Sequence, residues 1–375
     1  MIDKKSIQNQ IDNELEKVKK NIKKPNVFIV GGTGVGKSSL INTIFGEKVA
    51  SISNGKPETR GIIKYSLENI NLFDTEGLEL NEKNEEKFNT EVLGYIENKK
   101  TEKQENQIHL IWYLISASSD RITDYQTKIF NDLKKFNIPV AVVFTKCDLA
   151  TEIGVEKMIQ CLYPSMTYKK SFEEDKINPP FFTSNNIDEE LNPKHLIDWS
   201  ISKLPEVLQE GFISAQILNY EAKYNKAKNI ILQHTSGNAL VGFTPIPFSD
   251  APVLIMSQIG MLSRIISLYD IKAFDLKSFM ATTGTGLIIS NFGKSAVASL
   301  LKFIPVIGTV AGGIINAGVA GAITFAMGTS LNVILNKLYI NILKDNQENI
   351  NFILSNFDQI FSDEFNQQFK KKSNE

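Results

Sequence analysis

The chain has few cysteines and no excess of charge of either sign. Only Cys147 and Cys161 occur among its 375 residues, and neither belongs to a CxxC pair or has histidines at ligand spacing. We therefore expect neither a disulfide framework nor a zinc site. With 41 basic and 42 acidic side chains the formal net charge is −1. That balance offers no electrostatic reason to expect nucleic acid as the main partner.

The N-terminus lacks the apolar run of a secretory signal, so we expect a cytoplasmic protein. Apolar residues instead recur every three or four positions from residue 5 to residue 22. This spacing predicts an amphipathic helix that Pro25 ends. We assign residues 1–24 to this N-terminal segment.

Residues 25–207 alternate apolar runs with helical patterns. The runs at 109–115 and 140–144 are nearly continuous, which is typical of strands buried on both faces. Between them, Thr123 and Gln126 are placed to form a capping box at a helix start. The alternation predicts an α/β fold, a doubly wound and mostly parallel sheet with helices on both faces.

A glycine-rich segment follows the first predicted strand, residues 26–30. Residues 31–38 read Gly-Gly-Thr-Gly-Val-Gly-Lys-Ser and match the phosphate-binding pattern GxxxxGK[ST]. Glycines let the backbone wrap a phosphate, and its N–H groups then point at the ligand beside a helix N-terminus. The lysine is expected to bridge the β- and γ-phosphates, and the serine after it to supply a hydroxyl to Mg²⁺. The nucleotide-binding residues predicted here are Gly32, Gly34, Val35, Gly36, Lys37, Ser38 and Ser39.

A DxxG motif follows the strand predicted at residues 70–73. Residues 74–77 read Asp-Thr-Glu-Gly. Asp74 is expected to hold Mg²⁺ through water, and the Gly77 amide to sense the γ-phosphate.

A third motif favours guanine over adenine. Thr145 to Asp148 read Thr-Lys-Cys-Asp at the end of a predicted strand. The carboxylate can accept hydrogen bonds from guanine N1 and N2, and a site that leaves such partners unpaired rejects the wrong base. The stem of Lys146 is expected to cover the base. Ser184 and Asn185, after the next strand, are expected near guanine O6.

In this order, over residues 26–205, the motifs resemble those of the Era/TrmE-type small GTPases. The resemblance implies a P-loop GTPase domain that converts GTP to GDP and phosphate with Mg²⁺. It also implies a switch threonine that closes on Mg²⁺ and the γ-phosphate. Thr59 is the candidate, and a plain loop threonine is the alternative. The chain departs from the family pattern at Thr145, where Asn is usual, and at Glu76, where Pro is usual.

Leu78 follows DxxG, where Ras-like enzymes carry a glutamine that orients the attacking water. Because leucine cannot hydrogen-bond water, we expect slow intrinsic hydrolysis, stimulated by dimerisation or a partner. Catalytic roles are assigned to Lys37 and Thr59 alone, and no catalytic base is named.

Residues 208–375 lack alternating strand patterns and predict an all-α, glycine-rich C-terminal domain. Within residues 223–337, the segments 245–252 and 304–313 and the spaced glycines Gly318 and Gly321 resemble the YcjF-like helical domain, which implies membrane association without an established activity. Residues 303–336 contain no charged side chain. Two interpretations stay open: this stretch enters a bilayer, or it forms the core of a soluble bundle.

Three function classes follow. The first is a GTPase switch whose nucleotide state acts on a helical domain at an anionic or inner membrane, with a nucleotide-dependent homodimer as one arrangement. The second is a soluble GTP-dependent scaffold with negligible turnover. The third is an RNA- or ribosome-associated Era-like GTPase, which the nearly balanced charge of the C-terminal domain disfavours.

Overall fold

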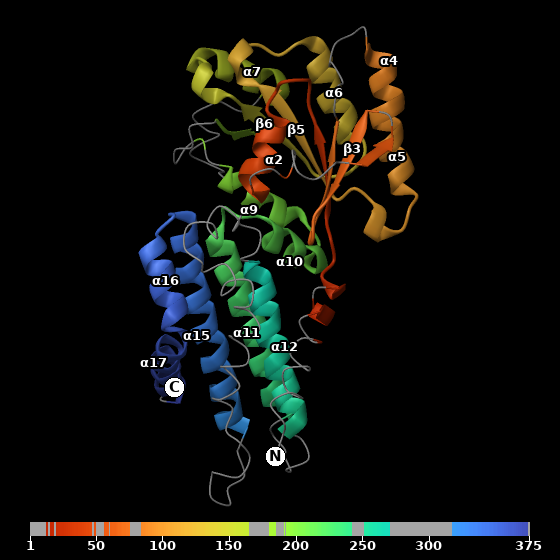
Figure 1. The fold of residues 1–375 in the computed structure, drawn as a ribbon. Coiled ribbons are helices and arrows are strands. Elements are labelled where there is room, and N and C mark those ends of the chain that lie inside the picture. Colours follow the sequence, from red (N-terminus) through yellow and green to blue (C-terminus); the bar gives the residue numbers. More distant parts are fainter. Residues whose placement is uncertain are drawn as a thin grey trace, which may run out of the picture. The chain divides into compact units, whose positions relative to one another are not determined.

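The computed structural model describes residues 13, 16–18, 20–46, 49, 56–59, 61–75, 84–164, 180–184, 191, 193–241, 251–270 and 317–373. The chain divides into two compact units (Figure 1). One unit, here called the sheet unit, is Lys23–Asn219. The other, the helical unit, combines Met1–Ile22 with Tyr220–Glu375. Each is described by itself.

The sheet unit contains a seven-stranded sheet with the order β2-β3-β4-β1-β5-β6-β7. Its strands are β1 (Asn26–Val30), β2 (Lys56–Thr59), β3 (Ile62–Ser66), β4 (Asn71–Asp74), β5 (Leu110–Ser116), β6 (Val140–Thr145) and β7 (Phe181–Phe182). The pairs β2–β3 and β3–β4 are antiparallel, and the other four pairs are parallel. The expected α/β fold with a mostly parallel sheet is confirmed.

Helices cover both faces of this sheet (Figure 1). Alternate residues of β1 point to opposite faces, so Phe28 and Val30 join one core cluster while Val27 and Ile29 join the other. The first cluster includes side chains of α4 (Glu85–Phe88), η2 (Asn89–Leu93), α5 (Gly94–Lys100), α6 (Asp124–Lys134) and α7 (Glu152–Leu162). The second includes side chains of α2 (Lys37–Phe45), α9 (Lys194–Lys203) and α10 (Glu206–Ala215). The predicted capping box, Thr123 with Gln126, is present at the start of α6.

Helix α10 belongs to the sheet unit, although the boundary was expected at residue 207. The Phe212 ring lies edge-on to Phe45 and Trp112, with centroids 6.0 and 6.2 Å apart. A Cβ at Gly211 would lie 2.4 Å from the Lys23 carbonyl oxygen, so glycine permits a close backbone approach. Aromatic packing and this contact hold α10 on the sheet.

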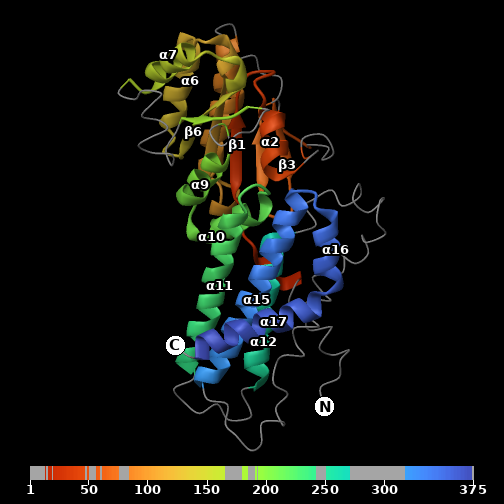
Figure 2. The ribbon, with the colours of Figure 1, turned by 90° about the vertical axis from the view of Figure 1, so that its left-hand side faces the viewer.

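From residue 220 onward, the described part of the helical unit contains α11 (Tyr220–Val241), α12 (Ala251–Tyr269), α15 (Ala317–Leu343), α16 (Gln347–Ser355) and α17 (Phe357–Ser373) (Figure 2). Helix α15 packs against each of the other four. At Gly328 an added Cβ would lie 2.7 Å from Ile231 of α11 and 3.0 Å from Met261 of α12. Glycine therefore lets three helices meet closely.

No helix that the structure describes is both long and apolar enough to cross a membrane. Residues 303–316 of the uncharged stretch lie outside the described residues, and so do residues 245–250. Most of the two segments that carry the YcjF-like resemblance is therefore not described, whereas its glycines Gly318 and Gly321 lie in α15. That resemblance stays a prediction. Most of the predicted N-terminal helix also lies outside the described residues, apart from a helical part between residues 13 and 21.

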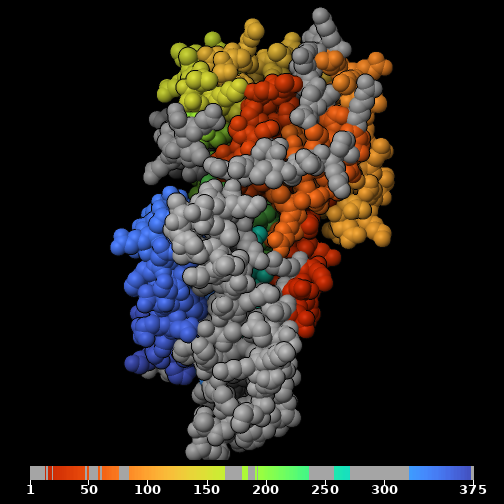
Figure 3. Space-filling view, in the orientation of Figure 1, coloured from red at the N-terminus to blue at the C-terminus, as the bar shows by residue number. Residues whose placement is uncertain are grey.

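Helix α17 carries a ladder of phenylalanine rings. Phe357, Phe361, Phe365 and Phe369 stack in succession, with ring centroids 6.1, 6.1 and 5.9 Å apart. Phe357 and Phe361 are buried. Figure 3 shows α16 and α17 (blue) at the surface of the helical unit.

Candidate functional site

The glycine loop connects β1 to α2 and requires glycine at three places. Gly34 and Gly36 have φ values of +73° and +102°, which residues with a Cβ rarely adopt. At Gly31 an added Cβ would lie 2.9 Å from the Val35 side chain and 3.0 Å from the Leu114 carbonyl oxygen. Gly34 and Gly36 bend the loop, and Gly31 lets it lie close to β5.

The start of α2 is open to an anionic ligand. Gly36 is its N-cap and provides no side-chain cap, and α2, which is described throughout, has no acidic residue in its first turn. The first N–H groups of a helix lack intrahelical partners, and the helix dipole adds positive potential there. Ser38 and Ser39 are exposed in this turn. These predicted residues therefore lie where a phosphate would meet them.

Lys37 is buried in the loop itself. Its ammonium group donates to the carbonyl oxygens of Gly31 and Gly32, at 2.9 and 3.1 Å. It also lies 3.9 Å from Oδ1 of Asp74, and both side chains are under one-tenth exposed. The pairing of Ile29 with Asp74 across β1 and β4 explains this proximity. The structure thus brings together the charged residues of the first two motifs.

Thr75, to which the sequence motifs assign no role, connects the same two motifs. Its N–H donates to the Ile29 carbonyl at 3.1 Å, and its hydroxyl accepts from the Gly31 N–H at 3.4 Å. The hydroxyl also lies 3.3 Å from the Ile29 carbonyl oxygen. Thr75 is fully buried. The only signal for this role in the sequence is its place directly after Asp74.

The Thr-Lys-Cys-Asp motif reaches the glycine loop from β6. The Thr145 hydroxyl donates to the Val35 carbonyl at 2.5 Å. The Lys146 ammonium donates to the Gly34 carbonyl at 2.6 Å, from a residue with a φ of +55°. Two side chains of one motif thus bind two successive carbonyls of the other.

Asp148 lies in a single 3-10 turn, η5 (Cys147–Leu149), and its side chain is exposed. The turn is held beside β7 because the Cys147 N–H donates to the Thr183 carbonyl at 3.2 Å. Ser184, the next residue, is buried. The predicted base-binding residues with described side chains therefore come from two neighbouring strand ends.

The Cys147 thiol is largely buried and hydrogen-bonded to the backbone. Burial, the main cause, raises its pKa to about 12. The thiol donates to the Phe144 carbonyl at 3.2 Å. A protonated, hydrogen-bonded thiol is a poor nucleophile, so this cysteine is inert at neutral pH.

Comparisons with known proteins agree with this geometry. A family model described as "50S ribosome-binding GTPase" matches residues 26–146. The GTPase Era of Clostridium kluyveri is 30% identical over 216 residues, which cover 54% of this chain and 67% of that protein. The chain belongs to the Era-like family of P-loop GTPases.

Other Era-like relatives match a smaller share of their own length. The GTPase Era of a Thermoanaerobacter species is 31% identical over 197 residues, which cover 48% of this chain and 60% of that protein. The tRNA modification GTPase MnmE of Mesoplasma florum is 30% identical over 177 residues, which cover 45% of this chain and 36% of that protein. The chain therefore spans about three fifths of the length of the Thermoanaerobacter protein.

The residues predicted to form the switch of this Era-like chain lie partly outside the described residues. Thr59 is exposed at the end of β2 and pairs with Ile62, while Ile63 of β3 pairs with Asp74. At the usual strand spacing, Thr59 lies about 10 Å from β4, at the same edge of the sheet. Glu76, Gly77, Leu78 and Asn185 lie outside the described residues.

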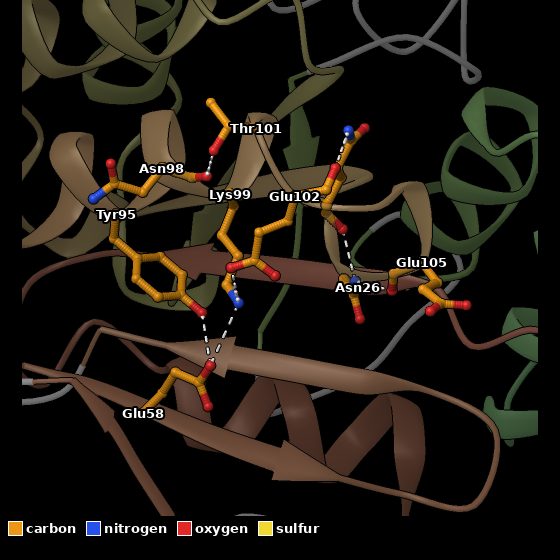
Figure 4. A network of polar contacts seen from close by, with 9 residues as sticks. Asn26, Glu58, Tyr95, Asn98, Lys99, Thr101, Glu102 and Glu105 are labelled. Carbon is orange, nitrogen blue, oxygen red and sulfur yellow. Dashed lines mark hydrogen bonds and ion pairs between the residues drawn. The ribbon is translucent and has the colours of Figure 1, made fainter.

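A polar network joins β2 of this Era-like chain to α5, as Figure 4 shows. The Tyr95 hydroxyl donates to a carboxylate oxygen of Glu58 at 3.4 Å. The Lys99 ammonium lies 3.5 Å from the same oxygen and 3.0 Å from Glu102. Burial, followed by the neighbouring Glu58 charge, raises the pKa of Tyr95 above its usual value. Glu58 immediately precedes Thr59, so the network fixes the strand that carries the switch candidate.

Asn26, the first residue of the central strand β1, binds the segment that precedes β5. Its side-chain amide donates to the carbonyls of Glu105 and Gln107, at 2.9 and 2.7 Å (Figure 4). Its backbone N–H donates to Nδ1 of His109 at 2.9 Å. Burial lowers the pKa of His109, whose Nε2 lies 3.0 Å from the Gln104 carbonyl oxygen. The imidazole is thus neutral, with its proton on Nε2.

Proposed function

We propose that the sheet unit binds GTP and GDP and hydrolyses GTP with Mg²⁺. One observation carries this proposal: Thr145 and Lys146 donate to the carbonyls of Val35 and Gly34, at 2.5 and 2.6 Å. Because of these bonds, the turn that exposes Asp148 and the loop that leads into α2 form one site.

The phosphate end of the ligand would occupy the start of α2. The N–H groups there would hold the β-phosphate, and Ser39 would reach the α-phosphate. The Lys37 ammonium, which now donates to two loop carbonyls, would extend to the β- and γ-phosphates and stabilise the charge that develops on transfer. Gly77 would contact the γ-phosphate.

The base end would face Asp148. Its carboxylate would accept from guanine N1–H and from the N2 amino group, two donors that adenine does not present there. The stem of Lys146 would cover the base. Ser184 and Asn185 would lie near guanine O6.

Mg²⁺ fits the oxygen donors of this site. The ion usually takes one or two protein oxygens and completes its shell with phosphates and water. The exposed Ser38 hydroxyl and the Asp74 carboxylate beside Lys37 are such oxygens. In the part of the chain that the structure describes, no three His, Cys, Asp or Glu residues form a metal cluster of their own. Bound Mg²⁺ would supply positive charge between the phosphates, and Thr59 would close on it from β2.

Hydrolysis would be slow without a partner. Leu78 occupies the position after DxxG and cannot orient a water molecule. Stimulation would come from a second copy of the chain or from another protein. The nucleotide state would act on the helical unit through the switch segments, and membrane contact by that unit remains part of this proposal. A soluble scaffold with negligible turnover is the opposing arrangement.

A ribosome-associated role is the second candidate. It is favoured by the family model, whose description names 50S ribosome binding, and by the Era relatives. The matched residues 26–146 lie in the sheet unit. Co-sedimentation of the full chain with 50S subunits, in the presence of GDP or a non-hydrolysable GTP analogue, tests this role. Liposome flotation with the same nucleotides tests membrane contact instead.

Calorimetry of the full chain with GDP and ADP tests the proposed function. We expect GDP to bind at least about a hundredfold more tightly, because ADP leaves the Asp148 carboxylate without its two donors. Asp148→Ala should remove this preference, while Asp132→Asn, on α6 and outside the nucleotide motifs, should retain it. Equal affinities for GDP and ADP in the unmodified chain would overturn the proposal.

A further inference from the structure

We propose that Asp120 positions the guanine-recognising turn and so sets how well Asp148 distinguishes guanine. Asp120 lies after β5, at the end of the 3-10 turn η4 (Ala117–Ser119), which packs against both η5 and α7. None of the motifs includes it. The inference rests on the proposed function, because it concerns the same base site.

The turn that carries Asp148 is anchored on its N-terminal side by contacts already described. Lys146 donates to the Gly34 carbonyl, and the Cys147 N–H donates to the Thr183 carbonyl. On the C-terminal side the chain passes through Ala150 to Thr151, the N-cap of α7. The position of Asp148 therefore depends on what holds Thr151.

Asp120 holds Thr151 with both carboxylate oxygens. Oδ1 accepts from the Thr151 N–H at 2.9 Å, and Oδ2 accepts from the Thr151 hydroxyl at 3.1 Å. The same hydroxyl accepts from the Gly154 N–H at 3.0 Å, which caps α7. Since a hydroxyl has one proton, the Thr151 hydroxyl donates to Asp120 while it accepts within α7. The carboxylate thus fixes both the backbone and the rotamer of the cap residue.

Two local features that cost stability serve this one contact. Asp120 has a φ of +50°, a left-handed conformation that is unfavourable for a residue with a Cβ, although Asp tolerates it better than most. Gly154 lies in the first turn of α7, where glycine is a poorer helix former than alanine. An added Cβ there would lie 2.2 Å from Oδ1 of Asp120 and 2.5 Å from its Cβ. Strain of this kind persists where the surrounding structure requires a particular geometry.

Recognition of guanine needs such an anchor because two hydrogen bonds must form from one exposed carboxylate. A turn held at both ends is preorganised, and ligand binding then does not have to order it. If the C-terminal anchor were lost, the carboxylate could meet N1–H or N2–H singly but not both at good geometry. Inosine diphosphate lacks the N2 amino group, so its affinity reports the phosphate and N1 contacts without the second bond.

The experiment compares GDP and inosine diphosphate affinities by calorimetry on the full chain. Asp120→Gly accommodates the positive φ and removes both acceptors, while Asp120→Asn keeps one carbonyl oxygen for the Thr151 N–H. We expect Asp120→Gly to weaken GDP binding about tenfold, the scale of one hydrogen bond to a charged group, and inosine diphosphate binding by less than about threefold. Asp120→Asn should fall between this variant and the unmodified chain.

Variants at the partner residue provide a matched pair. Thr151→Ser keeps the hydroxyl and should preserve the GDP preference, whereas Thr151→Val removes it and should behave like Asp120→Gly. Because Asp120 and Thr151 form one contact, the double variant Asp120→Gly/Thr151→Val should lose little more GDP affinity than either single variant. Gly154→Ala, a change that usually stabilises a helix, should displace the carboxylate and lower the GDP preference.

The outcomes separate this inference from the function on which it rests. Loss of equal size for GDP and inosine diphosphate in Asp120→Gly would mean that Asp120 only supports the fold, and would overturn the inference while the GDP-over-ADP preference stands. Absence of that preference in the unmodified chain would overturn both. If Asp120→Gly does not fold, Asp120→Asn, Thr151→Ser and Thr151→Val decide the question. The measured quantity is again the loss of GDP affinity relative to the loss of inosine diphosphate affinity.

Discussion

The two units use polar side chains in different ways. In the sheet unit, Lys37, Thr145 and Lys146 bind carbonyls of one glycine loop, and the groups left at the surface beside it include Ser38 and Asp148. In the helical unit, comparable bonds connect helices to one another. Gln258 donates to Thr324 at 3.0 Å, and the Tyr269 hydroxyl donates to Asn332 at 2.7 Å. The same chemistry therefore presents functional groups in one unit and joins α12 to α15 in the other.

Lys223 is the clearest example of a polar side chain that connects helices of the helical unit. From α11 it donates to the Leu268 carbonyl of α12 at 3.0 Å and lies 5.2 Å from the ring centroid of Tyr339 on α15. It is fully buried. Lys37, by contrast, lies beside a helix start that can accept an anion. The predictions below test whether the two lysines differ in this way.

The largest effect is expected for Lys37→Ala. Removal of the ammonium group should lower the rate of GTP hydrolysis about a thousandfold, the scale seen when one electrostatic donor to a transition state is lost. Single-turnover hydrolysis measures this, and Lys128→Ala on the exposed face of α6 is the control. A variant that keeps most of its activity would contradict the assignment of Lys37 to the phosphates.

A pH effect of intermediate size is expected from Lys223. Burial lowers its pKa to about 7, against the opposing charge of Asp270. An unfolded lysine has a pKa of about 10.4, so between these values the unfolded chain binds more protons and stability should rise with pH. Urea unfolding should show a gain of about 3 kcal/mol from pH 7 to pH 9.5 relative to Lys223→Met.

The same Lys223→Met chain also tests the comparison itself. We expect its GDP affinity to match that of the unmodified chain, because Lys223 lies outside the sheet unit. If the free energy of unfolding changes with pH equally in the unmodified chain and in Lys223→Met, then Lys223 keeps an ordinary pKa. A changed GDP affinity would show that this helical contact reaches the nucleotide site.

A smaller effect is expected from Glu58→Gln, which weakens the link between β2 and α5. Partly exposed ion pairs contribute little, so we expect about a threefold fall in kcat for GTP hydrolysis. GDP affinity should not change, because Thr59 would meet only the γ-phosphate and Mg²⁺. Glu97→Gln, which weakens an ion pair with Lys100 on α5, is the matched control. An equal loss in both variants would remove the special role of Glu58.

The smallest effect concerns His109. Its folded-state pKa is lowered, so the unfolded chain takes up the proton first as pH falls below about 6.5. Stability from this group is complete above that pH and declines below it. Protonation at Nδ1 would also oppose the bond from the Asn26 N–H. We expect stability to fall between pH 7 and pH 5.5, and we expect this fall to be absent in His109→Gln.

The local part of the site could be predicted from the sequence. The glycine loop needs residues close together in the chain, and the strands around it are buried runs. The structure has β1 at Asn26–Val30 and β6 at Val140–Thr145, and the capping box at Thr123 is present. Each of these features depends on neighbours within a few residues.

The long-range part could not be predicted. Thr75, Asp120 and Thr151 act through contacts between loops that lie far apart in the chain, and no spacing rule encodes those distances. The attachment of α10 has the same origin, since the apolar face of Phe212 could have packed on either unit. Only the fold shows that it meets Trp112.

The bonds from Thr145 and Lys146 to the glycine loop have a consequence for ligand size. In the proposed function, they would fix the spacing between the phosphate site at the start of α2 and the base site at Asp148 before anything binds. Neither free guanosine nor pyrophosphate would span that interval, so each would contact only half of the site. A nucleoside joined to at least two phosphates would satisfy both halves together.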